Sequence, residues 1–199
     1  MKRRSLHDPH AGFTLVELLV VVVVIVILAT IGMVAYDDAK KRAYNAQITQ
    51  GVAQYLKAIQ TYRGLNGTYP KVSSETGALN AVSLTCLGKG YPGASCGTVA
   101  GVEVHEDAGF NTAIADVIGD TIPSIGKEAL SVSGEIFIGA VYGIDQIDPV
   151  KYSGAMYGRV INYALLGADA DCTVAESYSY SIATTKPATT ACEIYIDAK

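Results

Sequence analysis

The hydrophobic pattern of the chain opens with one long apolar segment. No charged residue occurs at positions 18–36, and residues 13–36 contain a single ionisable side chain, Glu17. As an α-helix these 24 residues extend about 36 Å, which is enough to cross a bilayer. A cleaved secretory signal fits less well, because its apolar stretch is shorter and a small-x-small site follows it. The pattern therefore predicts a transmembrane helix over residues 13–36.

Beyond residue 36 the pattern becomes that of an amphipathic helix. Apolar residues recur at spacings of three and four, which places them on one helix face: Ile48, Val52, Tyr55, Leu56, Ile59 and Tyr62. The sequence turns polar after Tyr36 without a helix breaker, and Gly64 and Gly67 supply a stop, so we expect the helix to continue over residues 37–64 and to end near Arg63. The charged residues at positions 37–42 are expected at the membrane surface.

The remaining residues, 65–199, predict a globular head. Four β-rich runs, separated by Gly, Pro or Asp clusters, cover residues 135–142, 156–166, 178–183 and 193–197. Such runs predict a small antiparallel sheet. Residues 71–134 are rich in Gly, Ser, Ala and Thr and predict an irregular connection. Within it the spacing of four apolar residues indicates a short helix: Phe110, Ile114, Val117 and Ile118.

All four cysteines lie beyond the apolar segment: Cys86, Cys96, Cys172 and Cys192. An even count outside an export segment favours disulfides, and buried free thiols are the alternative. Three pairings are open, of which we favour Cys86 with Cys96 and Cys172 with Cys192, because each closes a local loop. A zinc site is not expected, because no C-x-x-C pair occurs.

Glu17 is the unusual residue of the apolar segment. A carboxylate costs about 2.5 to 3.5 kcal/mol at the centre of a membrane helix and less near its end, so a simple anchor would be better without it. No cation of the same chain lies in the first turns after Gly12. We therefore expect its partner to be a positive charge of another chain or a newly exposed α-amino group at Phe13.

The sequence Ala-Gly-Phe-Thr-Leu-Val-Glu-Leu-Leu at positions 11–19, after a short basic leader, resembles the processing site of type IV pilins and pseudopilins. The resemblance implies that a membrane peptidase removes residues 1–12 by cutting between Gly12 and Phe13. It also implies that the new amine of Phe13 is methylated and that Glu17 guides assembly. Many family members have a proline near the end of the apolar stretch, where this chain has Gly32.

The same resemblance implies an α+β, pilin-like fold, in which the long N-terminal helix packs on a small antiparallel β-sheet. The expected function is that of a type IV pilus subunit, with roles such as cell adhesion or twitching motility. The implied partners are further copies in a helical filament, the prepilin peptidase, the pilus assembly machinery and, before assembly, membrane lipid. The precursor is expected in the cytoplasmic membrane with its N-terminus inside, and the assembled subunit at the cell surface.

Two alternatives remain open. A pseudopilin of a type II secretion or DNA-uptake system shares the N-terminal features. A single-pass membrane protein with an exported binding or enzymatic domain shares the apolar helix, but in such a protein Glu17 has no role. Mass spectrometry of the mature N-terminus separates the last possibility from the other two.

Charge and composition argue against other functions. The net charge is −4, and the basic residues beyond position 60 are scattered singly, so nucleic acid is not an expected partner. His105 is the only histidine beyond the leader, which gives little support to a catalytic site, and no enzyme activity or cofactor is expected. Several acidic residues lack a metal-binding spacing and are expected to be solvated: Glu103, Glu106, Asp107, Asp169 and Asp171.

Overall fold

The computed structural model describes residues 14–75, 82–99, 101–119, 125, 126, 128–132, 134–146, 157–168, 170–172, 174, 177–182 and 189–196. It divides into two units, residues 1–40 and residues 41–199. Helix α1 (Leu15–Asn66) contributes to both of them, and all the described strands lie in the second.

The first unit contains the apolar part of α1. Its large apolar side chains are exposed, from 49% at Val23 to 89% at Leu15. The most apolar 18-residue window of α1 has a mean hydropathy of 3.3 and is not buried against the rest of the chain. Among the described residues, α1 is the one helix long and apolar enough to cross a membrane.

In the second unit, α1 buries one face. Five of the six residues expected on that face are buried, and Tyr62 is half-buried. The helix ends at Asn66, three residues beyond the expected Arg63. Gly67 adopts φ +71°, and its amide donates to the carbonyl of Arg63 at 2.8 Å, as in a left-handed C-terminal cap. Gly67, and not Gly64, therefore ends the helix.

Two antiparallel sheets form the head. Sheet A has the order β1-β6-β7-β9-β8, with β1 (Ser83–Cys86), β6 (Ala140–Gln146), β7 (Tyr157–Leu166), β9 (Thr189–Tyr195) and β8 (Ser177–Ile182). Sheet B has the order β3-β2-β5-β4, with β3 (Val102–His105), β2 (Ser95–Val99), β5 (Glu135–Phe137) and β4 (Leu130–Val132). A short 3₁₀ turn, η1 (Pro92–Ala94), precedes β2, and helix α2 (Ala108–Ile118) follows β3.

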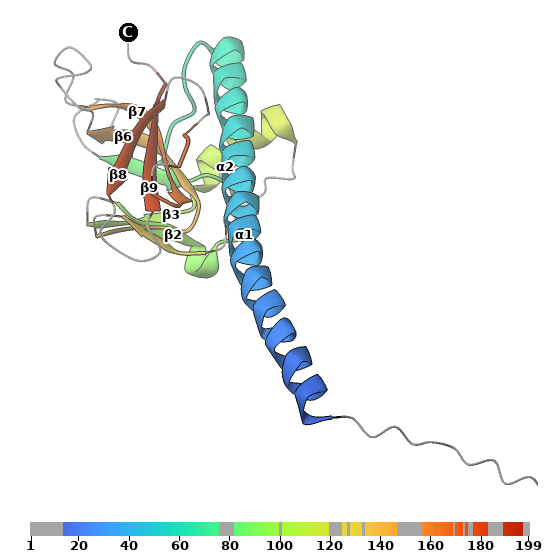
Figure 1. Cartoon of the computed structure of the whole chain (residues 1–199). Helices are drawn as coiled ribbons and strands as arrows, with labels where there is room; N and C mark the ends of the chain where they lie inside the picture. Colours follow the sequence, from blue (N-terminus) through green and yellow to red (C-terminus); the bar gives the residue numbers. More distant parts are fainter. Residues whose placement is uncertain are drawn as a thin grey trace, which may run out of the picture. The chain divides into compact units, whose positions relative to one another are not determined.

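Sheet A is the middle layer of the head. One of its faces packs with buried residues of α1 and with Phe110 and Ile114 of α2. Its other face contributes Val141, Ala164 and Leu166 to a second core that is shared with sheet B. Figure 1 shows strands β6 to β9 beside α1, with β2 and β3 as a separate layer. β7 is buried along almost its whole length, which fits a sequence that is largely apolar apart from Gly158, Arg159 and Asn162.

The α+β fold class, a long helix packed on antiparallel sheet structure, is confirmed. The short helix is confirmed as α2. The expectation of an irregular connection over residues 71–134 is wrong, because β1 to β4 lie within it. These strands have only three to five residues, so the alternation in Val-Glu-Val-His of β3 or Leu-Ser-Val of β4 is too brief to stand out in a segment rich in Gly and Ser.

The expected run at 135–142 is divided between the two sheets. Residues 135–137 form β5 in sheet B, and residues from 140 onward form β6 in sheet A. Gly139 lies at the crossing, where a Cβ atom would come within 1.8 Å of the Ile125 carbonyl oxygen. The close approach of these two backbone segments therefore requires glycine.

The disulfides are Cys86–Cys96 and Cys172–Cys192, each with Cα atoms 5.7 Å apart. This is the local pairing favoured from the sequence. Cys86 ends β1 of sheet A, whereas Cys96 lies in β2 of sheet B, so the first bridge joins the two sheets. The second connects the segment after β7 to β9.

Candidate functional site at the N-terminus of α1

The first turn of α1 contains a capping box formed by Thr14 and Glu17. The Oε2 atom of Glu17 accepts hydrogen bonds from the Thr14 amide at 2.9 Å and from its hydroxyl at 2.8 Å. In return the Glu17 amide donates to Thr14 Oγ1 at 3.2 Å. This reciprocal arrangement satisfies backbone donors that the first turn of a helix otherwise leaves unpaired.

Sequence reasoning missed this role of Thr14. The sequence was taken to predict a cation as the partner of Glu17. The Thr-x-x-Glu pattern at positions 14–17 could also have predicted a capping box, in which Thr14 is a hydrogen-bonding partner. The capping box uses Oε2, so the second carboxylate oxygen, Oε1, takes none of these three hydrogen bonds. As a carboxylate oxygen, it can accept a hydrogen bond.

Apolar side chains surround this carboxylate along the helix. Leu15, Val16 and Leu18 are 89%, 70% and 58% exposed. Such surface is unfavourable in water and favourable in lipid or against other apolar helices. Gly12 and Phe13, the expected cleavage and methylation residues, lie outside the described residues.

The helix continues without interruption through Gly32, where proline is common in the family that the sequence resembles. Two residues earlier, the Thr30 hydroxyl donates to the carbonyl of Ile27 at 2.8 Å. A Cβ atom at Gly32 would meet nothing within 4 Å. Glycine is therefore not required by packing within this chain, and its helix cost relative to alanine is about 1 kcal/mol.

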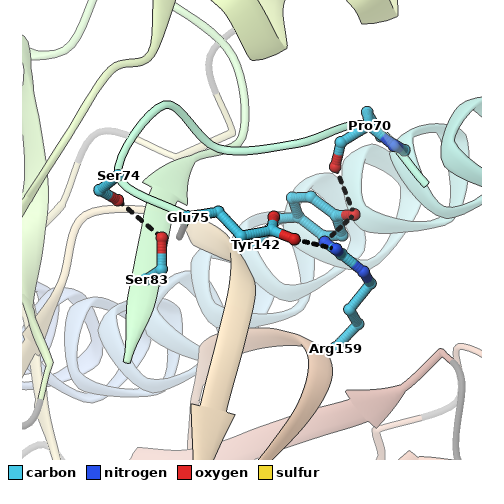
Figure 2. Close-up of polar contacts among 6 residues, drawn as sticks. All are labelled: Pro70, Ser74, Glu75, Ser83, Tyr142 and Arg159. Atoms are coloured by element: carbon cyan, nitrogen blue, oxygen red, sulfur yellow. Dashed lines mark hydrogen bonds and ion pairs between the residues drawn. The ribbon is translucent and has the colours of Figure 1, made fainter. Parts of the chain in front are cut away.

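A second notable cluster lies in the head, where Arg159 of β7 is buried with Glu75 (Figure 2). Their side chains are 9% and 4% exposed, and Arg159 Nη2 donates to Glu75 Oε1. Arg159 Nη1 donates to the hydroxyl of Tyr142 at 3.2 Å, and that hydroxyl donates to the carbonyl of Pro70 at 2.9 Å. The cluster therefore fastens the segment that follows α1 to sheet A.

Electrostatics favour the charged form of Arg159. Burial opposes the charge, but hydrogen bonding to Glu75, together with attraction from Tyr142 and Glu75, outweighs it and raises the pKa of the guanidinium. The Tyr69 ring lies 5.5 Å from the Arg159 guanidinium and 4.5 Å from that of Arg63. Both guanidinium groups are therefore within cation–π distance of the same ring. Neither the ion pair nor its tyrosines had a signal in the sequence, because their members are far apart along the chain.

Two of the acidic residues considered as metal ligands, Glu106 and Asp107, have other roles, and Asp169 lies outside the described residues. Glu106 Oε1 accepts from the amides of Gly90 and Tyr91, at 2.7 and 2.8 Å. Asp107 caps α2 by accepting from the Phe110 amide at 2.8 Å. Glu103 and His105 are exposed side chains 3.8 Å apart. In the part of the chain that the structure describes, no group of three or more His, Cys, Asp or Glu side chains could hold a metal ion.

Residues 9–33 match the family model of the prokaryotic N-terminal methylation motif. This motif is the class III signal of type IV pilins and pseudopilins, and it contains the capping box described above. No curated protein matches the chain significantly. No solved structure matches it significantly either.

The motif, over residues 9–33, and the apolar helix point to a class of protein. They support a type IV pilin-like or pseudopilin protein, which is a structural class of protein. The signal implies processing by a prepilin peptidase and assembly in a pilus-type system. The apolar, exposed helix at Leu15–Tyr36 fits anchoring in a membrane.

Proposed function

We propose that the chain is a structural subunit of a type IV pilus filament. The observation that carries the proposal is the match to the methylation motif, together with a hydrogen-bonded Glu17 in the first turn of an exposed apolar helix. In this proposal the peptidase cuts between Gly12 and Phe13, the Phe13 amine is methylated, and the subunit polymerises through α1.

The proposed division of the chain follows from that function. Residues 1–12 are the removed leader, and residues 13–36 form the transmembrane and assembly helix. Residues 37–64 continue it as the amphipathic helix, and residues 65–199 form the head. The precursor stays in the cytoplasmic membrane with its N-terminus inside, so the head lies where disulfides persist. After assembly it is displayed on the cell surface.

Assembly exchanges lipid contacts of the helix for close packing against other helices. A carboxylate and an ammonium group that enter such an apolar interior unpaired each cost several kcal/mol. Glu17 already accepts from Thr14 through Oε2, and Oε1 has capacity for the Phe13 ammonium of a neighbouring subunit. Pairing the two charges removes both costs and selects the correct axial position of the incoming subunit.

Two measurements test the proposal. Mass spectrometry of the mature protein should give an N-terminus at methylated Phe13, and immunogold electron microscopy should show the chain along surface filaments. A Glu17→Ala variant should still insert into the membrane but be lost from filaments. Asp116→Ala, which removes an exposed carboxylate from α2, is the matched control and should assemble normally.

The outcomes are distinct. A protein that retains Met1 in the membrane, or normal piliation by Glu17→Ala, contradicts the proposal. Correct processing without surface filaments, in cells where a secretion or DNA-uptake system depends on the chain, would instead assign it as a pseudopilin.

A further inference from the structure

A cleft opens where the edges of the two sheets meet. β1 ends the strand order of sheet A and β3 ends that of sheet B. The Thr85 hydroxyl of β1 donates to the carbonyl of His105 in β3 at 3.1 Å, which holds the two edges together at one point. Beside this contact is a cavity of about 350 Å³, lined by β3, by residues 82–84 and by residues 72–74. We call it the edge cleft.

The apolar wall of the edge cleft is incompletely covered. Val102 pairs with Val99 across β3 and β2, so their side chains share one face of sheet B. Val99 and Val104 are 2% exposed on that face, but Val102 is 59% exposed. An apolar group that packed against Val102 at this open end would remove its exposed surface from water.

The rim of the edge cleft is acidic. Glu103, Glu106 and Asp107 line it, and no lysine or arginine does so among the described residues. His105 is the remaining titratable group there. A partner segment that combines an aliphatic side chain with positive charge would complement both the wall and the rim.

The chain itself presents such a segment in the last turn of α1 and the loop after it, which continues into the cleft-lining residues 72–74. Leu65 is 75% exposed, more than any other large apolar side chain described in residues 41–199. It lies in the last turn of α1, and residues 62–72 around it contain Arg63 and Lys71 but no acidic residue. Lys71 is exposed.

We propose that the edge cleft of one subunit receives Leu65 of a second copy, with Lys71 of that copy near Glu103. The inference rests on the proposed function, because it assigns a head-to-head contact within the filament. Leu65 and the edge cleft are different surfaces, so the contact is heterologous, and it repeats along an open helix where its rotation does not close a ring. A filament requires such an open helical polymer.

Cross-linking tests the contact in assembled protein. The four native cysteines are paired, so a bismaleimide reacts only with introduced thiols. A variant that carries both Leu65→Cys and Val102→Cys should give a ladder of covalent multimers in sheared filaments. The control carries Leu65→Cys with Ile136→Cys, which places the second thiol at another exposed apolar position of sheet B, and should give none.

Charge reversal gives an independent measurement. Glu103→Lys and Lys71→Glu should each lower the amount of filament roughly twofold to fivefold, the effect of one exposed ion pair. The double variant should recover most of the loss.

The experiments distinguish failure of the proposed function from failure of the cleft contact alone. If the wild-type chain forms no filaments, the proposed function fails and this inference fails with it. If filaments form but the Leu65–Val102 pair gives no ladder, only the cleft contact is overturned. A cross-link from Val102→Cys to a different protein would likewise exclude a second copy as the occupant.

Discussion

The side-chain amide of Asn45 in α1 pairs with the backbone of Leu166 at the end of β7. Asn45 Nδ2 donates to the Leu166 carbonyl, and the Leu166 amide donates to Asn45 Oδ1, both at 2.8 Å. The asparagine thus supplies one donor and one acceptor to a strand end, as a neighbouring strand would. This relationship joins the long helix to the central strand of the head.

Replacing Asn45 by alanine should destabilise the head by about 1 to 3 kcal/mol, because the Leu166 amide and carbonyl lose their partners in a partly buried site. Urea unfolding of the detergent-solubilised protein, followed by tyrosine fluorescence, measures the change. Gln47→Ala, on an exposed position of the same helix, should leave the midpoint unchanged. Equal midpoints for the two variants would contradict the structural role of Asn45.

Removing one member of the Arg159–Glu75 pair should lower the unfolding free energy much more than replacing both members by apolar residues. Arg159→Met leaves a buried carboxylate without its counter-charge, and we expect a loss of about 3 to 5 kcal/mol in unfolding free energy. A double variant, Arg159→Met with Glu75→Leu, removes both charges and should recover most of that loss. A double-mutant cycle by chemical unfolding measures the coupling, and strictly additive effects would argue against it.

Thr14 provides a test of the capping box that is separate from Glu17. Thr14→Val keeps the shape of the side chain but removes the hydroxyl, and loss of such a cap costs helices about 0.5 to 2 kcal/mol. We expect normal membrane insertion and fewer filaments, with a smaller defect than for Glu17→Ala. Thr14→Ser retains the hydroxyl and should assemble as the wild type does. Quantifying sheared filaments against membrane-bound subunit decides the question.

Asp107 should make stability depend on acid pH. Partial burial opposes its ionisation, but hydrogen bonds from Phe110, Ser73 and Gly109 outweigh burial and lower its pKa. A group with a lowered folded pKa stabilises the protein above its ordinary pKa, about 4, and this contribution is lost as pH falls through the lowered value. Asp107→Asn keeps a good helix cap and should flatten the stability curve between about pH 5 and pH 2. An unchanged slope would exclude Asp107 as its source.

The sequence predicted those parts of the fold whose pattern is long and periodic. The apolar face of α1 and the short helix at Phe110 and Ile114 follow from spacing alone, and β7 follows from its length. Three strands of sheet B, β2, β3 and β4, were missed because they are too short for alternation to stand out, whereas β5 falls within the run expected at 135–142. The break at Gly139, which assigns adjacent residues to different sheets, depends on a backbone contact with Ile125 that no local pattern encodes.

The candidate site likewise has features that the sequence predicts and features that it does not. The position of Glu17 was evident because one charge interrupts an apolar run, and its hydrogen bonds to Thr14 are a local pattern that could have been read. The Arg159–Glu75 pair and the edge cleft could not be predicted from the sequence, because each forms only where segments distant along the chain meet. Spacing along the chain carries no information on such contacts.

The bridge between Cys86 and Cys96 has a mechanical consequence for a subunit under load. Sheet B contacts sheet A through an apolar layer and through side-chain hydrogen bonds such as that from Thr85 to His105. With the bridge in place, a pull on β2 is transmitted to β1 through covalent bonds, and from there to β6 through backbone hydrogen bonds. Force applied to the outer layer should therefore stretch the head as one body before it can peel the two sheets apart.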